Sequence, residues 1–138
     1  MNTERVVNEE LQTIDYVRNT KNYSKKQLKK LQKTGSQQPV ILRIARNIEK
    51  NKLVFQMGTG KAVTALEAAQ FVAKDVDAID INLGCKKKIS VSGGMGSQLL
   101  KDVERASDII KTLKRNLQIP VSCKIRLLED TRKTVDFC

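Results

Sequence analysis

The sequence predicts an α/β fold in which parallel strands alternate with helices. From residue 53 onward, apolar strand-like runs and amphipathic helical stretches follow one another in the order β-α-β-α-β. Single helices that join successive strands in this way need right-handed crossovers, so the strands lie parallel. The polar residues that follow each strand are a further observation, and they favour one architecture within this class.

We predict strands over residues 53–58, 76–84 and 121–128, where runs rich in apolar residues are bounded by polar or turn-forming segments. Helices are predicted over 61–74 and 103–117, because apolar residues recur there at i, i+3, i+4 and i+7. These five elements are sufficient for three parallel strands and two crossovers.

The first forty residues differ from the rest in pattern. Residues 5–17 have apolar side chains at helical spacing, which predicts a short amphipathic helix with the face Val6, Val7, Leu11, Ile14 and Val17. Residues 18–38 are rich in Lys, Asn, Gln and Ser, and we predict an exposed, mobile insertion. A further strand is predicted over residues 40–44.

Composition limits the function classes. The 138 residues allow one domain or part of one, and a formal charge of +11 suits a polyanionic partner, either nucleic acid or an acidic membrane surface. The chain has no long apolar run and no signal-peptide pattern, so we expect no membrane segment and a reducing, cytoplasmic location, with the nucleus as an alternative. Three cysteines without a CxxC pair, and no histidine, argue against disulfide frameworks, metal sites and His-based triads.

Polar or reactive residues stand at the carboxyl ends of three predicted strands. Gln56 ends the first, Asn82 and Cys85 end the second, and Lys124 and Arg126 lie near the end of the third. Open doubly wound sheets and closed (β/α)8 barrels both place their chemistry at strand carboxyl ends. Three consecutive strands with such residues favour a partial (β/α)8 barrel.

Cys85 lies just beyond a strand end and directly before three lysines at 86–88. A positive field favours thiolate, which would make this thiol a usable nucleophile or acid, whereas the alternative is a small buried apolar residue. The glycine-rich turn at 93–96 allows close backbone approach and has a weak signal for phosphate binding, since it matches no standard phosphate loop.

Lys124 and Arg126 are expected on one face of their strand by alternation, with a solvated edge as the alternative. Gln56 interrupts an apolar run, and a buried amide there needs hydrogen-bond partners.

Several of these segments together resemble one family, the tRNA-dihydrouridine synthases, which are FMN enzymes on a (β/α)8 barrel. The resemblance rests on IDINLGC at 79–85, SGGMGSQLL at 92–100, FQMG at 55–58 and VSCKIRLL at 121–128, in the expected order. RVVNEELQTIDYV at 5–17 looks like the eukaryotic branch that modifies uridine 20 of the tRNA D-loop. The whole chain, 1–138, then resembles an incomplete barrel domain with a Lys-rich insertion at 18–38.

The resemblance implies roles for individual residues. Cys85 matches the family's general acid, which protonates uracil C5 while reduced FMN delivers hydride to C6, and NADPH then reduces the flavin again. Gln56 and Lys124 match flavin-contacting positions, with the lysine stabilising negative charge on the ring. Asn82 and Arg126 match positions that hold the target base after it has left the RNA stack.

The chain also departs from the family pattern. Lys86 replaces the proline that normally follows the cysteine, which removes a fixed φ from the loop. A complete barrel needs roughly 250 residues, so three or four of its strands are expected here, with exposed edges that favour self-association. Two other readings are a non-catalytic basic RNA-binding protein derived from the same barrel and a phosphate-binding barrel enzyme of different chemistry.

Overall fold

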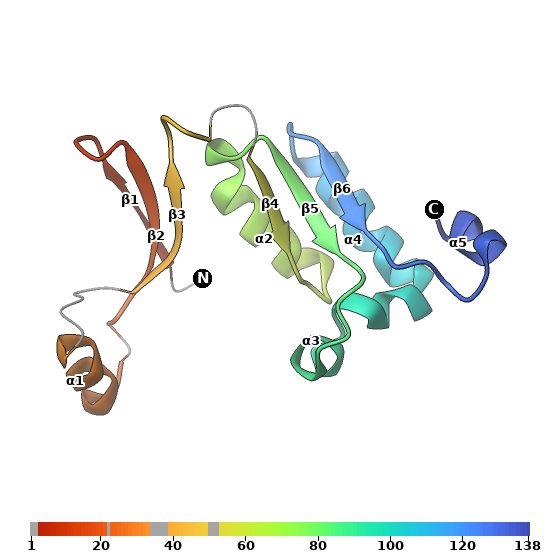
Figure 1. The fold of residues 1–138 in the computed structure, drawn as a ribbon, viewed down its shortest axis with the longest axis horizontal. Helices are drawn as coiled ribbons and strands as arrows, with labels where there is room; N and C mark the ends of the chain where they lie inside the picture. Colours follow the sequence, from red (N-terminus) through yellow and green to blue (C-terminus); the bar gives the residue numbers. More distant parts are fainter. Residues whose placement is uncertain (1–2, 22, 34–38, 50–52) are drawn as a thin grey trace. The chain divides into compact units, whose positions relative to one another are not determined.

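The computed structural model describes residues 3–21, 23–33, 39–49 and 53–138, and the chain divides into two units, Met1–Lys50 and Asn51–Cys138. Each unit contains one three-stranded sheet, β1-β2-β3 in the first and β4-β5-β6 in the second (Figure 1). The sequence-based prediction of one incomplete barrel domain over residues 1–138 did not distinguish these two sheets.

The first unit begins with an antiparallel hairpin. Strand β1 (Thr3–Asn8) pairs with β2 (Thr13–Arg18), and β2 pairs in turn with β3 (Val40–Ala45), also antiparallel. Ile14, Tyr16, Val17 and Ile44 are buried in this unit. β3 is the strand predicted over 40–44, but it belongs to this antiparallel sheet and so is not one of the parallel strands.

The helix predicted over 5–17 is wrong. The Asn8 side chain accepts a hydrogen bond from the Leu11 N–H at 2.9 Å, and Gln12 has φ of 51°, so the chain turns where the helix would have continued. Val6 and Leu11, expected on the buried helical face, are 44% and 61% exposed. The helical spacing of the apolar residues was coincidental, and the β-branched residues on both sides of the turn favour strands.

Helix α1 (Lys25–Lys33) lies within the segment predicted as an insertion at 18–38, between β2 and β3. None of its side chains is buried. The two ends of the segment are tied together, because the Arg18 N–H donates to the Pro39 carbonyl at 2.9 Å. Part of the predicted insertion, residue 22 and residues 34–38, lies outside the described residues.

The second unit is the predicted α/β structure. Strands β4 (Val54–Met57), β5 (Ala78–Asn82) and β6 (Val121–Lys124) are parallel and neighbours in that order. The predicted crossover helices are α2 (Ala62–Val72) and α4 (Val103–Asn116). The α/β class with a parallel sheet is therefore confirmed, while the partial (β/α)8 barrel stays a prediction.

Three short helical segments and a terminal helix complete this unit. They are η1 (Ala73–Asp75), α3 (Lys88–Ser92), η2 (Gly96–Lys101) and α5 (Thr131–Phe137). Asp102 begins α4 by accepting a hydrogen bond from the Arg105 N–H, and Asp130 begins α5 by accepting from two backbone N–H groups. These are the N-cap interactions that start helices.

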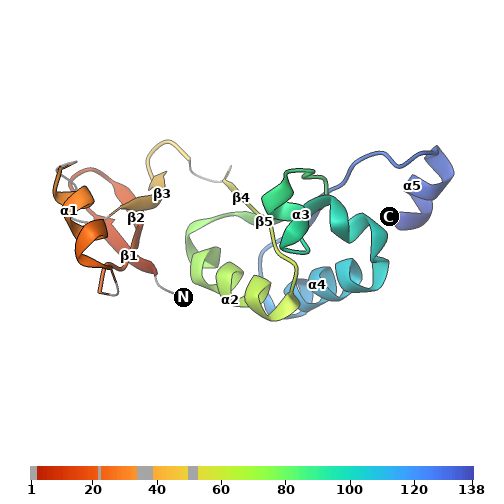
Figure 2. The ribbon, with the colours of Figure 1, turned by 90° about the horizontal axis from the view of Figure 1, so that it is seen from below.

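Both long helices lie along one face of the parallel sheet (Figure 2). Ile79 and Ile81 of β5 are fully buried, and Ile109 and Leu113 of α4 are buried with them. Ala65 and Ala69 of α2 are also buried, and their small side chains permit close packing of the helix. Because strand residues alternate between faces, Asp80 and Asn82 of β5 point to the face opposite the helices.

Candidate active site

Polar side chains occupy the sheet face opposite the two helices. In β5, Asp80 and Asn82 alternate with the buried isoleucines, and Gln56 of β4 is the register partner of Asp80. In β6, Ser122 is opposite Asp80, and Lys124 is opposite Asn82. All five residues therefore come from one face of three adjacent parallel strands. They are Gln56, Asp80, Asn82, Ser122 and Lys124.

These side chains form a continuous hydrogen-bonded series across the sheet. The Asp80 carboxylate accepts from Ser122 Oγ at 2.7 Å and from Gln56 Nε2 at 2.6 Å. The Gln56 Oε1 atom accepts in turn from Asn82 Nδ2 at 3.0 Å. Both ends of the Gln56 amide are therefore hydrogen-bonded, which fixes its orientation. These are the hydrogen-bond partners that the sequence predicted Gln56 would need.

Asn82 connects this series to the cysteine loop. Its Oδ1 atom accepts hydrogen bonds from the backbone N–H of Gly84 at 3.0 Å and from that of Cys85 at 2.9 Å. One side chain therefore contacts Gln56 on the neighbouring strand and also positions the backbone of Cys85. An asparagine is suited to this double role, because it has both donor and acceptor atoms.

The glycine-rich turn holds the same loop from the other side. Gly96 has φ of 61°, and a Cβ atom there would lie 2.5 Å from the Cys85 carbonyl oxygen. The Ser97 N–H donates to that oxygen at 2.9 Å. Because this N–H is used within the loop, the turn supports Cys85 and offers fewer free donors to an anion than its sequence suggested.

The thiol of Cys85 has a specific hydrogen-bond donor. Ser90 Oγ donates to Cys85 Sγ at 3.3 Å. This bond lowers the pKa of Cys85, and the backbone N–H of Lys87 and the charges of Lys87 and Arg126 act in the same direction, while desolvation opposes them. From the sequence, the three lysines at 86–88 were expected to favour the thiolate, whereas the leading cause of the lowered pKa is the hydroxyl of Ser90.

Arg126 lies near Cys85, but it does so from a loop and not from the strand face on which it was predicted. Strand β6 ends at Lys124, so Arg126 stands in the following loop and does not continue the Lys124 face of the strand. Its Nε donates to the carbonyl oxygen of Gly84, next to the cysteine. Gly84 permits this approach, because a Cβ at that position would be 3.1 Å from Arg126 Cγ.

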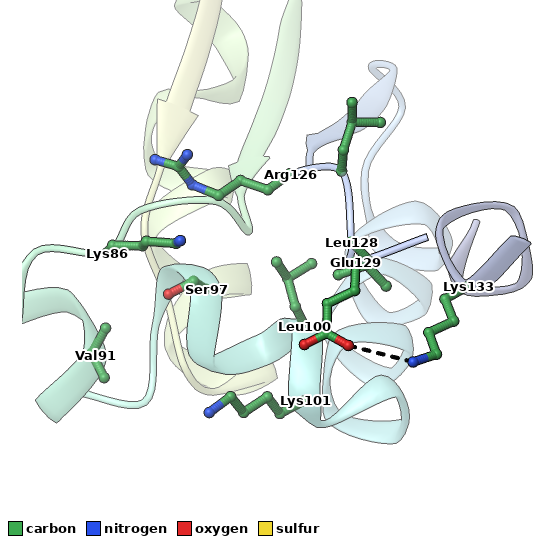
Figure 3. A pocket seen from close by; sticks show the side chains of 10 residues that line it. Lys86, Val91, Ser97, Leu100, Lys101, Arg126, Leu128, Glu129 and Lys133 are labelled. Carbon is green, nitrogen blue, oxygen red and sulfur yellow. Dashed lines mark hydrogen bonds and ion pairs between the residues drawn. The ribbon is translucent and has the colours of Figure 1, made fainter. Parts of the chain in front are cut away.

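A cavity of about 770 Å³ opens beside this loop (Figure 3). Four cationic side chains contribute to its lining, together with one carboxylate, Glu129, which pairs with Lys133 at 3.5 Å. The remaining walls are largely apolar. The lining residues are Lys86, Val91, Ser97, Leu100, Lys101, Arg126, Leu127, Leu128, Glu129 and Lys133.

The structure connects three of the five residues singled out from the sequence, Gln56, Asn82 and Cys85, by direct hydrogen bonds. Lys124 is exposed on the same face, as the register partner of Asn82. Asp80 and Ser122 were missed, although strict alternation with Asn82 and Lys124 was a sufficient signal. Ser90 was also missed, because only the turn of α3 brings its hydroxyl back to the thiol.

Comparison with known proteins identifies the chain's relatives. Residues 3–138 match the dihydrouridine synthase (Dus) family. The chain belongs to this family. It is 39% identical to the tRNA-dihydrouridine(20) synthase [NAD(P)+] of Schizosaccharomyces pombe and 36% identical to that of Saccharomyces cerevisiae, over 96% of its length in both cases. A human tRNA-dihydrouridine(20a/20b) synthase [NAD(P)+]-like protein is 33% identical over 62% of the chain.

The chain is short beside these Dus proteins. It spans 26% of the Schizosaccharomyces protein, 33% of the Saccharomyces protein and 28% of the human one. The resemblance seen in the short motifs is confirmed, and it extends over nearly the whole chain, including the hairpin of the first unit.

Among the described residues, no helix is long and apolar enough to cross a membrane. Within the same part of the chain, His, Cys, Asp and Glu side chains form no group of three or more that could hold a metal ion.

Proposed function

We propose that this chain forms part of the catalytic domain of a tRNA-dihydrouridine synthase that reduces uridine 20 of the D-loop. The observation that supports this most strongly is the hydrogen-bonded connection from Gln56 through Asn82 to Cys85. It brings an amide and a thiol from adjacent parallel strands to one rim of the sheet. The names of two relatives that are similar over nearly the whole chain state the same activity.

The parallel sheet is proposed as a segment of a (β/α)8 barrel. In such barrels the helices cover the outside and the opposite strand face points to the barrel axis. Helices α2 and α4 lie on one face here, and the polar series occupies the other. The carboxyl ends of β4, β5 and β6 then contribute to the catalytic rim.

The polar face fits FMN by its chemistry. Gln56 and Lys124 are exposed there, one offering amide donors and acceptors and the other a positive charge. A ring edge with carbonyl and imide groups matches such partners, and a cation beside it stabilises negative charge on the reduced ring. When bound, FMN would supply hydride to uracil C6, with NADPH as the source of electrons.

Cys85 is proposed to supply the proton. The Sγ–H proton moves to uracil C5 as the C5–C6 double bond is reduced, and the thiolate remains on the protein. The groups that lower the pKa of Cys85, first the hydroxyl of Ser90 and then the Lys87 N–H, stabilise this thiolate. A more acidic thiol is the better proton donor, provided that it is protonated at the start of each cycle.

Arg126 and the neighbouring cavity are proposed to receive the nucleotide. Arg126 and Lys86 provide cationic groups, and Leu100 and Leu128 provide apolar walls. A nucleotide needs both, because its phosphate is anionic and the face of its base is apolar. Asn82 is proposed to contact the base through its second Nδ2–H, because its Oδ1 accepts from two backbone N–H groups and its other Nδ2–H donates to Gln56.

The test uses the protein in its full length with unmodified tRNA. Cys85→Ala should retain the yellow flavin and lose dihydrouridine formation by about 10²- to 10⁴-fold, the usual contribution of a general acid. Cys123→Ala is the matched control, because Cys123 lies on the helix side of β6. Undiminished dihydrouridine in Cys85→Ala would refute the acid role, and loss of flavin in both variants would point to misfolding.

The alternative is a non-catalytic basic RNA-binding protein derived from the same barrel. Two observations favour it, the formal charge of +11 and the replacement of the expected proline by Lys86 beside Cys85. A colourless full-length protein with salt-dependent tRNA affinity would support this alternative. A yellow protein that forms dihydrouridine would exclude it.

A further inference from the structure

Helix α1 has its own start signal and does not depend on the sheet for it. Ser24 Oγ accepts from the Gln27 N–H at 3.4 Å, and the Gln27 side chain accepts from the Ser24 N–H at 2.8 Å. This reciprocal pair is a capping box, which satisfies two backbone donors at a helix N-terminus. Figure 1 shows α1 beyond the end of strands β2 and β3, away from the sheet face. A locally encoded helix thus presents its side chains to solvent.

The charges of α1 are gathered on one side. At 3.6 residues per turn, its five lysines fall within an arc of about 140°, and Leu28 and Leu31 fall on the opposite side. Among the described residues, only lysines line an open cavity of about 570 Å³: Lys25, Lys26, Lys29, Lys30 and Lys33. Residues 19–38 contain no Asp or Glu, so the segment supplies no counter-charge of its own.

This arrangement is unfavourable for an isolated helix. Lys25 and Lys29, Lys26 and Lys30, and Lys29 and Lys33 are pairs of like charge at i, i+4, which destabilise a helix. Lysines in the first turn also oppose the helix dipole, whose N-terminal end is positive. An external polyanion would relieve both effects at once.

We propose that the lysine face of α1 binds the phosphate backbone of RNA, as a contact separate from the catalytic rim. The inference deepens the proposed function, and it rests on tRNA being the substrate. Successive lysines of the row Lys25, Lys29 and Lys33 rise by about 6 Å each along the helix, so they contact a run of phosphates and not a single anion. Backbone contacts of this kind add affinity without reading sequence.

An anionic membrane is the weaker fit. Helices that lie in a membrane interface have a broad apolar face with aromatic or leucine residues. In α1 that face consists of Leu28 and Leu31, and Leu28 is only 39% exposed. The lysine side therefore has charge for a polyanion without the apolar area that insertion into lipid requires.

The experiment measures the affinity for fluorescein-labelled, unmodified tRNA as a function of salt, with the whole protein. The variant Lys25→Gln/Lys29→Gln/Lys33→Gln removes one row of charge, and glutamine has nearly the same helix propensity as lysine, so the helix is retained. The log–log salt slope should become shallower by about 2 to 3 units, because each phosphate neutralised contributes about 0.7 to 0.9. Circular dichroism checks that helix content is unchanged.

The matched control is Lys74→Gln/Lys111→Gln/Lys114→Gln, which removes the same charge from exposed positions of the second unit. A slope that falls only in the α1 variant supports the proposal. An equal fall in both variants overturns it, since α1 would then act only through net charge. Loss of binding to phosphatidylserine vesicles with unchanged tRNA affinity also overturns it.

A second measurement separates this inference from the proposed function. At saturating tRNA, the α1 variant should form dihydrouridine at the wild-type rate, with a raised KM for tRNA. If the wild-type protein forms no dihydrouridine but the α1 variant still loses salt-dependent binding, the proposed function fails and the α1 contact stands. If dihydrouridine forms and the salt slopes of the wild-type protein and the α1 variant are equal, the proposed function stands and the α1 contact fails.

Discussion

The hydroxyl of Ser90 donates a hydrogen bond to the thiol of Cys85, over 3.3 Å between oxygen and sulfur. The two residues are joined by the three-lysine loop and the first turn of α3. The reactivity of Cys85 therefore depends on a short helix that sequence motifs alone would treat as a spacer.

Removal of this hydroxyl should raise the pKa of Cys85. Since thiolate is the reactive form, the rate of alkylation by iodoacetamide should rise with pH through the pKa, and Ser90→Ala should move that rise to higher pH. Ser92→Ala is the control, because its hydroxyl contacts the Ile89 carbonyl and not the thiol. An unchanged pH profile in Ser90→Ala would show that the hydroxyl does not control this thiol.

Cys85 and Cys123 of the second unit should differ in the same assay. The pKa of Cys123 is raised, first by burial and then by the negative charge of Asp80, while the pKa of Cys85 is lowered. At neutral pH, Cys85 should therefore react before Cys123, as peptide mass mapping after brief alkylation can measure. Preferential labelling of Cys123 would contradict this assignment.

Gly96→Ala should disrupt the cysteine loop. The new Cβ would lie 2.5 Å from the Cys85 carbonyl oxygen, and φ of 61° is unfavourable for alanine by about 1–2 kcal/mol even without the collision. The midpoint of urea unfolding should fall accordingly. Gly58→Ala is the matched control, since its Cβ would only touch Met95 Sδ at 3.8 Å and should be tolerated.

Asn82→Asp should separate the two functions of Asn82. The aspartate keeps an acceptor for the N–H groups of Gly84 and Cys85, but it loses the donor to Gln56 and places negative charge near the thiol. The pKa of Cys85 should rise, and stability should fall by about 1 kcal/mol for the lost hydrogen bond. A combined Gln56→Glu/Asn82→Asp variant should be worse still, because two carboxylates would face each other.

The first unit should lose stability in acid through Asp15. Arg43 binds both Asp15 oxygens at 2.7 Å, and this hydrogen bonding lowers the pKa of Asp15 in the folded chain. A carboxyl group with a lowered pKa stabilises the fold at any pH above its unfolded pKa of about 3.9. This stabilisation is lost as pH falls through the pKa of the folded state. Asp15→Asn should flatten this part of the acid-unfolding curve, whereas Glu10→Gln, a change at an exposed turn carboxylate, should not.

Periodicity predicted the second unit well because its elements are governed by burial on one side. Apolar residues of α4 and the alternation of β5 both follow from contact with a single core, so the pattern along the chain reports the structure directly. The hairpin of the first unit was not predicted, because Val6, Val7 and Leu11 happen to match helical spacing although they are exposed. The hydrogen bond from the Leu11 N–H to the Asn8 side chain favours a turn over a helix here, and such a bond leaves no periodic pattern in the sequence.

The candidate site was likewise predicted in part. Residues at strand ends could be named from position alone, since parallel strands bring their carboxyl ends together. Interactions that depend on loop geometry could not: the Arg126 contact with Gly84 needs β6 to end early, and the Ser90 contact needs α3 to begin at Lys88. Self-association through the exposed strand edges and location in the cytoplasm or nucleus stay predictions.

The hydrogen bond between Arg18 and Pro39 closes the base of the connection that contains α1. What lies between these residues can change in length or charge while the β2–β3 pairing keeps its register, because loop closure costs only about 0.6 kcal/mol for each doubling of length. Related sequences are therefore free to vary this connection at little expense to folding. For protein engineers, it is a natural position at which to graft a fluorescent label or an unrelated recognition helix.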